Sequence, residues 1–363
     1  MIVPGLDVET YTDLAVLAAE QERVFARSWH FVGLRTELAE HNDWIATEIA
    51  GRGVTIQNFE GSLRGFGNVC SHRHARLRAE CRGNGLLRCP YHGWTYNEDG
   101  VPVGIPGNAE WFGLDRAAKR ELALPAVAVA CCGNLVFARI AADGPGLEDF
   151  LGDYFPLFAR ISSAFTNPFA EGSLAWRCNW KIGVESAIEA YHVDMVHPES
   201  FKPSIRGALP SASTGDHSAG PLLLSESALQ ALERLEPRLG LARLEVSERY
   251  DHYLAFPNFC LAVSAGLTLS IQTYEPVSPE AMRLRYRLLT GDSTKPALRQ
   301  GIMGKAVLGA FADFNSQVLA EDQAISEGIQ QGKAWRPLPP ARLGANEDRI
   351  QAFHAAWRRA MEA

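Results

Sequence analysis

Residues 70–94 read CSHRHARLRAECRGNGLLRCPYHGW, and the interpretation of the whole chain starts from this stretch. It contains a Cys-x-His pair, Cys70 and His72, and a Cys-x-x-His pair, Cys89 and His92, with sixteen residues between them. Thiolate sulfur and imidazole nitrogen are ligands of both zinc and iron–sulfur centres. The two pairs therefore predict a metal site. Their spacing suits a tetrahedral zinc ion as well as a cluster with Cys on one iron and His on the other.

The sequence around this motif predicts a small antiparallel β domain. Short apolar runs such as 44–50, 53–59 and 133–140 are separated by turns rich in Gly, Pro and Asn. We place this domain at 41–150 and expect a linker near 144–153, where Gly and Asp become frequent. Residues 1–40 are expected to form an N-terminal helical segment that packs on a second domain.

Composition excludes several classes of protein. The chain has 363 residues, 47% of them hydrophobic and 21% charged, which is typical of a globular protein with two domains. The net charge of -7 favours neither nucleic acid nor an anionic membrane as a partner. There is no signal peptide and no apolar run long enough to span a membrane, so we expect a cytoplasmic protein. Seven cysteines, an odd number, argue for reduced thiols or metal ligands over a disulfide framework.

The remainder of the chain, 151–363, alternates between helical and β-like patterns. The prediction is an α+β second domain in which an antiparallel sheet packs against helices. The segment 213–240 is expected to be a polar loop followed by a short helix. Helices are expected over 179–192, 301–331 and 347–361, and β-like runs over 253–263, 267–277 and 282–289.

A second set of potential metal ligands lies in the segment 179–197, which reads NWKIGVESAIEAYHVDMVH. Glu189 and His192 are three residues apart, which would place them on one face of a helix, and His197 follows five residues later. Two imidazoles and a carboxylate with open coordination positions suit a ferrous ion that activates dioxygen. The alternative is a solvated helix face with His197 in a loop.

The CPYHGW sequence at 89–94 resembles the second ligand loop of Rieske domains. The resemblance implies a [2Fe-2S] cluster, one per subunit, with Cys70 and Cys89 on the inner iron and His72 and His92 on the outer one. Replacing two thiolates by neutral imidazoles raises the reduction potential of such a cluster. His74 departs from the family pattern, which has Gly at this position, and we expect it to be a surface or packing residue.

The segment 179–197 resembles the iron-binding motif of Rieske non-haem iron oxygenases, and it follows the Rieske motif in the order found in that family. The resemblance implies one Fe(II) per subunit, with His192 and His197 as ligands. It also implies a third, distant carboxylate ligand on a C-terminal helix, and in the segment AEDQAISEGIQQG this position is Asp322. The competing carboxylates are Glu321, Asp313 and Glu327.

Glu189 occupies the family position that links the two metal centres across a subunit interface. The resemblance implies that Glu189 hydrogen-bonds His192 and, in the neighbouring subunit, His92. Most ring-hydroxylating members have Asp there, and Glu is more frequent in members that act on quaternary ammonium compounds. Ser186 stands where the family commonly has Asn. Both departures concern the substrate class.

The resemblance covers essentially the whole chain and implies a terminal oxygenase alpha subunit with a small β Rieske domain placed before a helix-grip catalytic domain. It implies O2 and a small organic, aromatic substrate, electrons from an NAD(P)H-dependent reductase with or without a ferredoxin, and a homotrimer. The alternatives are a monooxygenase or oxidative N-demethylase of a quaternary ammonium compound, and a Rieske electron carrier or zinc-binding protein without catalysis. Residues expected to line the substrate pocket are Phe201, Phe256, Phe259, Leu267, Leu269 and Tyr274.

Overall fold

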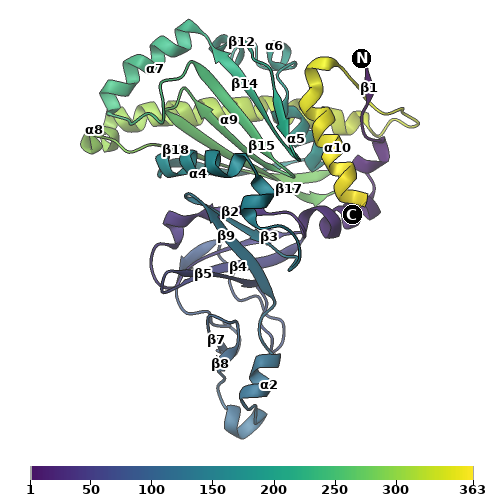
Figure 1. Cartoon of the computed structure of the whole chain (residues 1–363), viewed down its shortest axis with the longest axis vertical. Helices are drawn as coiled ribbons and strands as arrows, with labels where there is room; N and C mark the ends of the chain where they lie inside the picture. The colour runs from purple at the N-terminus through teal and green to yellow at the C-terminus, as the bar shows by residue number, and fades with distance from the viewer. Residues whose placement is uncertain (1, 363) are drawn as a thin grey trace. The chain divides into compact units, whose positions relative to one another are not determined.

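The computed structural model describes residues 2–362 and shows two compact units (Figure 1). One unit comprises 21–150 and 154–159, and the other comprises 1–20, 151–153 and 160–363. All strand pairs described are antiparallel, and helices accompany the larger sheet, so the predicted α+β class is confirmed.

The first unit is built on a seven-stranded sheet in the order β2-β10-β9-β5-β4-β3-β6. Its centre is apolar, since Ile56 of β4 and Val136 of β10 are fully buried. A separate hairpin, β7 with β8, follows the second ligand loop. The elements of this unit are β2 (His30–Leu34), β3 (Asp43–Ile49), β4 (Arg52–Phe59), β5 (Ser62–Gly67), β6 (Arg82–Asn84), β7 (Thr95–Tyr96), β8 (Pro102–Gly104), α2 (Arg116–Glu121), β9 (Ala126–Cys132) and β10 (Leu135–Arg139).

The second unit is built on an eight-stranded sheet, in which the path β11-β18-β17-β16-β15-β14-β12 is extended by β13 pairing with β14. The long helix α9 accompanies this sheet, and its Val307 and Phe311 pack on leucines of the apolar core (Figure 1). The strands of this unit are β1 (Val3–Pro4), β11 (Asn167–Trp176), β12 (Ile205–Ala208), β13 (Ala212–Thr214), β14 (His217–Leu224), β15 (Arg249–Ala255), β16 (Phe259–Ser264), β17 (Thr268–Ser278), β18 (Ala281–Thr290) and β19 (Arg342–Leu343).

Helices at both ends of the chain contribute to the second unit. An N-terminal helix is present as α1 and continues into wider π-type turns over Gln21–Phe25. The expected helical segment 1–40 is nevertheless divided, because residues from 21 onward belong to the first unit and His30–Leu34 is its strand β2. The helices of the second unit are α1 (Leu14–Glu20), α5 (Trp180–Ile188), α6 (Val193–Val196), α7 (Glu226–Leu239), α8 (Pro296–Gln300), α9 (Ile302–Gly332) and α10 (Asp348–Glu362). The segment expected to be a linker contains α3 (Leu147–Leu151), and α3 and α4 (Tyr154–Ala164) are divided between the two units.

Three expectations about local structure are wrong. The expected polar loop at the start of 213–240 is a β13–β14 hairpin that turns at Gly215, whose φ of 61° suits a residue without Cβ. The run 253–263 is two strands, because the chain reverses between β15 and β16. The helix expected over 179–192 ends at Ile188, and Glu189 has an extended backbone.

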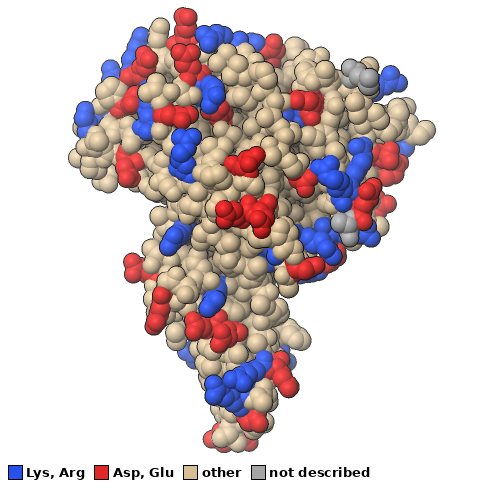
Figure 2. Space-filling model, viewed as in Figure 1, with Lys and Arg blue, Asp and Glu red and all other residues tan. Residues whose placement is uncertain are grey.

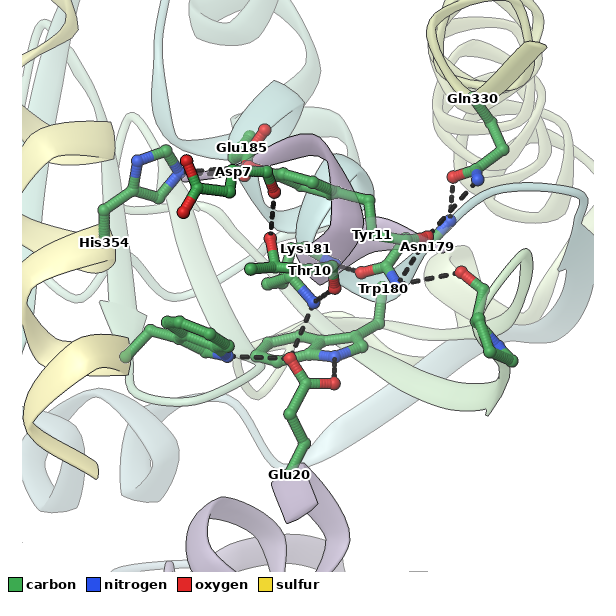
Figure 3. A network of polar contacts seen from close by, with 12 residues as sticks. Asp7, Thr10, Tyr11, Glu20, Asn179, Trp180, Lys181, Glu185, Gln330 and His354 are labelled. Carbon is green, nitrogen blue, oxygen red and sulfur yellow. Dashed lines mark hydrogen bonds and ion pairs between the residues drawn. The ribbon is translucent and has the colours of Figure 1, made fainter. Parts of the chain in front are cut away.

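A buried polar network fixes the start of α5 (Figure 3). Lys181 Nζ lies 2.6 Å from Glu20 Oε1, and both side chains are fully buried. Glu20 also accepts hydrogen bonds from the indole nitrogens of Trp180, at 2.9 Å, and Trp357, at 2.7 Å. Asn179 caps α5 by accepting from the Lys181 backbone N–H. Side chains from α1, α5 and α10 therefore meet at one carboxylate.

Charge is mixed over the surface. On the face seen in Figure 2, basic and acidic side chains lie among one another, and several basic side chains lie over α2. No helix within residues 2–362 combines the length and the apolar character that crossing a membrane requires.

We predict that Lys181→Met destabilises the second unit by about 3–5 kcal/mol, because it leaves the Glu20 carboxylate buried without its cation. The measurement is denaturant unfolding followed by tryptophan fluorescence. Lys202→Met is the matched control, since the pair that Lys202 forms with Asp194 is exposed and should contribute less than about 1 kcal/mol. Recovery of stability in the Lys181→Met/Glu20→Gln double variant would support the explanation, and equal effects of the two Lys→Met variants would contradict it.

Candidate metal centres

The two loops that carry the Cys and His pairs have the same backbone design. Cys70 N–H donates to the carbonyl of Ala75, and Cys89 N–H donates to the carbonyl of Trp94, five residues on in each case. The fourth residue after each Cys returns a hydrogen bond to that Cys carbonyl. This fourth residue is His74 in one loop, with φ 59°, and Gly93 in the other, with φ 75°. His74 is exposed, as expected, and its positive φ is one that glycine adopts more readily. This turn explains why the family has Gly where the chain has His74.

The four side chains are sorted by depth. Cys70 and Cys89 are 1% and 2% exposed and belong to an apolar core with Leu77 and Leu87, whereas His92 is exposed. The ring centroids of His72 and His92 are 4.7 Å apart. The sulfur atoms are thus on the inner side of the site, and the imidazoles are on the outer side.

Contacts within the loops leave donor atoms available for a metal. His72 stacks on Trp94 with ring centroids 4.7 Å apart, yet its buried Nδ1 has no partner among the described residues. The Tyr96 hydroxyl lies 3.0 Å from Cys70 Sγ, and the Tyr91 N–H donates to Cys89 Sγ at 3.4 Å. Burial raises the pKa of the Cys89 thiol, so a cation is needed to hold it as thiolate.

The geometry distinguishes between zinc and a cluster. A single tetrahedral zinc ion would bring its four donor atoms to within about 4 Å of one another. Among residues 2–362, only one group of three or more His, Cys, Asp or Glu has donor atoms within 4.8 Å of one another, and none of the four loop residues belongs to it. The loop residues therefore fit a cluster of two irons better than one ion.

That one convergent group is His192, His197 and Asp322. Asp322 Oδ1 lies 3.0 Å from His197 Nε2 and 3.5 Å from His192 Nε2. His192 and His197 stand at the two ends of the short helix α6, and Asp322 lies on α9, which packs against α6. Two imidazole nitrogens and one carboxylate directed at a common point are a donor set for Fe(II).

Glu189 lies beside this group, though not as expected. It does not share a helix face with His192, because α5 ends at Ile188. Instead, its carboxylate accepts from the backbone N–H groups of Tyr191 and His192, which replaces the lost helical hydrogen bonds. Its other oxygen lies 2.5 Å from His192 Nδ1. The expected contact between Glu189 and His192 therefore exists, on a turn between two helices.

The competing carboxylates differ in the residues that they contact. Glu321 contacts His197 at Nδ1, the side away from Asp322, so it does not join the convergent group. Glu327 accepts from Arg177, and Asp313 is exposed. The sequence offered three alternatives to Asp322, and of the four carboxylates only Asp322 converges with the two histidines.

Two family models match the chain. The ring hydroxylating alpha subunit catalytic domain matches 166–363, and the Rieske [2Fe-2S] domain matches 28–126. The chlorobenzene dioxygenase alpha subunit of Cupriavidus sp. is 25% identical, over 98% of this chain and 90% of that protein. The oxygenase subunit of glycine betaine monooxygenase from Chromohalobacter salexigens is 30% identical, but the match spans 52% of this chain and only 42% of that protein.

Solved structures share the fold. The quaternary ammonium Rieske monooxygenase CntA in complex with L-carnitine superposes with a TM-score of 0.82, covering 99% of this chain and 96% of that one at 20% identity. Naphthalene 1,2-dioxygenase with bound indole gives 0.80, with coverage of 99% and 92% at 19% identity.

We predict that Fe²⁺ binding to the metal-free protein strengthens as pH rises. Burial alone would lower the pKa of His192, but hydrogen bonds with Asp322 and Glu189 raise it to about 9. The metal must displace this proton, so below that pKa the apparent Kd should fall about tenfold per pH unit. Anaerobic Fe²⁺ titration at several pH values measures the slope, and an affinity independent of pH across neutrality would contradict the prediction.

Proposed function

We propose that this chain is a terminal oxygenase subunit that uses O2 to hydroxylate a small organic molecule. The chain belongs to the ring-hydroxylating alpha subunit family, whose members are oxygenases. The observation that carries the proposal is the convergence of His192, His197 and Asp322 in a chain that also has a Rieske domain. A carrier of electrons alone has no need of this second group. The family binds a [2Fe-2S] cluster in its Rieske domain and one Fe(II) in its catalytic domain.

This chain has two separate sets of residues that could each hold a metal centre. Cys70, Cys89, His72 and His92 would hold the cluster, and His192, His197 and Asp322 would hold the ferrous ion. The cluster would supply electrons one at a time, and the ferrous ion would supply the site for the reaction of O2 with the substrate. Three protein ligands would leave coordination positions free for O2.

We infer that Glu189 connects neighbouring subunits. It holds the Nδ1 edge of His192, and next to it Tyr191 and Met195 are 71% and 84% exposed. On the Rieske unit, exposed His92 lies beside Tyr91, while Trp111 is 77% exposed. Exposed apolar side chains near each centre favour a contact that buries both surfaces.

Because the two surfaces differ, a contact between them joins unlike faces of neighbouring copies, and such contacts form a ring when the rotation between copies closes. We infer a homotrimer in which Glu189 of one subunit hydrogen-bonds His92 of the next. Electrons would come from a separate NAD(P)H-dependent reductase, directly or through a ferredoxin, because the chain has no nicotinamide or flavin motif of its own.

The side chains near His197 bear on the substrate class. Phe201 lies edge-on to His197, with ring centroids 6.3 Å apart, and contacts Tyr250 at 5.2 Å and Phe314 at 6.4 Å. Burial raises the pKa of Tyr250, and the negative charges of Cys260 and Asp322 add to the effect. Several aromatic faces in one place can bind a cationic ammonium group.

Polar side chains lie on one face of β17 and on α9. Successive residues of a strand face opposite sides, so Ser270 and Gln272 of β17 share a face with Tyr274, while Leu269 lies on the other face. Ser270 Oγ and Asn315 Nδ2 of α9 are buried without a protein partner within the described residues. These groups can donate to an oxygen of a substrate. Leu269, which was expected to line the pocket, lies on the opposite face of β17 from Ser270.

The aromatic and polar groups together favour a second candidate function, oxidation of a quaternary ammonium compound that carries a carboxylate. Glu189 agrees with this alternative, and relatives named for glycine betaine and carnitine oxygenation are among the similar proteins. The first candidate, hydroxylation of an aromatic compound, agrees with the relatives named for chlorobenzene, biphenyl and benzene.

The test offers benzene, biphenyl, glycine betaine or carnitine to chemically reduced enzyme and measures O2 consumption together with product formation. We predict product from one of the two classes, with 18O from 18O2 retained if the product is a hydroxylated aromatic compound, and no product with Asp322→Ala or with His92→Ala. Mixed trimers formed by co-expressing these two variants should regain part of the activity, since an intact Rieske unit then faces an intact iron site in the next subunit. Inactive mixed trimers would contradict the intersubunit arrangement, and absence of product with every compound would argue against both substrate classes.

A further inference from the structure

His197 is held at both edges of its ring by consecutive residues of α9. Its Nε2 lies 3.0 Å from Asp322 Oδ1, and its Nδ1 lies 2.7 Å from Glu321 Oε2. The side chain of His197 is only 2% exposed, whereas those of Glu321 and Asp322 are 25% and 14% exposed. Glu321 and Asp322 thus approach the same imidazole from opposite sides.

The same arrangement occurs at the other histidine, with a different carboxylate. Glu189 Oε1 lies 2.5 Å from His192 Nδ1, and Asp322 is on the Nε2 side of that ring. An Nδ1–H that donates to a carboxylate leaves the lone pair on Nε2, where a metal can accept it. Each of the two imidazoles therefore has its own carboxylate to set the tautomer.

Other groups fix Glu321 itself. Its Oε2 also accepts from the Ser200 hydroxyl, and its Oε1 accepts from Gln317 Nε2 at 3.1 Å. Both oxygens of Glu321 are therefore engaged, which fixes the orientation of its carboxylate.

We propose that Glu321 is a positioning residue for the iron site, which sets the tautomer and orientation of His197 and adds a negative charge one imidazole away from the metal. The inference rests on the proposed ligand set. Three carboxylates lie at the site, Asp322 within the ligand set and Glu189 and Glu321 each one imidazole away from it. Their excess negative charge strengthens binding of the metal and favours the ferric over the ferrous state.

Two substitutions separate the charge of Glu321 from its hydrogen bond. Glu321→Gln keeps an oxygen that accepts from His197 Nδ1 but removes the charge, and Glu321→Ala removes both. Loss of a carboxylate that supports a metal-bound histidine weakens metal affinity about 10–100-fold. We expect Glu321→Gln near the lower limit and Glu321→Ala near the upper one. In both variants the potential of the bound iron should rise, because the ferric state loses a stabilising charge.

The experiment titrates Co²⁺, whose visible spectrum reports its ligand geometry, into protein stripped of the mononuclear metal but retaining the Rieske cluster. An unchanged Rieske EPR signal shows that the first unit of each variant is folded, and an unchanged denaturant unfolding transition shows the same for the second unit. Asp313→Asn is the matched control, because Asp313 is an exposed carboxylate on the same helix, and its Co²⁺ affinity should equal that of the wild type. Ser200→Ala removes one donor to Glu321 but not its charge, and should weaken affinity less than Glu321→Gln.

Wild-type affinity and an unchanged Co²⁺ spectrum in Glu321→Ala would overturn the inference alone and leave Glu321 as a structural partner of Ser200. A wild-type chain that binds no Co²⁺ would overturn the inference together with the ligand set of His192, His197 and Asp322.

Discussion

The placement of the iron site depends on the hydrogen bonds that the buried carboxylate of Glu20 accepts. It receives Lys181 Nζ and the indole nitrogens of Trp180 and Trp357, all without access to solvent. A buried carboxylate of this kind is tolerated only when its hydrogen-bonding capacity is used. The chain satisfies it with groups from α5 and α10, and this fixes the helix whose last residue immediately precedes Glu189.

The side chains of the iron site lie at the ends of short helices and on the long helix α9. α5 ends at Ile188, Glu189 closes the turn that follows, and the next short helix carries a histidine at each end. The remaining carboxylates come from α9, where adjacent positions point to either edge of His197. Geometry of this kind needs rigid supports, because small displacements of a metal ligand weaken binding and chemistry alike.

Local motifs were predictable from the sequence, and long-range relations were not. The pairs at Cys70 and Cys89 bring their own ligands within a few residues, so they could be identified directly. Asp322 was reached through the resemblance of its helix to a family pattern. Glu321 was counted as a rival ligand, because a sequence does not show on which edge of His197 a carboxylate lies.

The helix break at Glu189 escaped prediction because its side chain replaces the helical hydrogen bonds, and no Gly or Pro marks the position. Nothing near Lys181 indicates that Glu20, so distant in the chain, is its partner.

The presence of two iron centres in one chain is tested most directly by the iron content of anaerobically purified protein, together with its low-temperature EPR spectrum after dithionite reduction. We predict a reduced Rieske signal and about three irons per chain, two in the cluster and one at His192, His197 and Asp322. We also predict that Asp322→Ala keeps the signal while its iron content falls to about two per chain. Colourless protein containing zinc, or two irons in the wild type even after reconstitution with Fe²⁺, would contradict the presence of two iron centres.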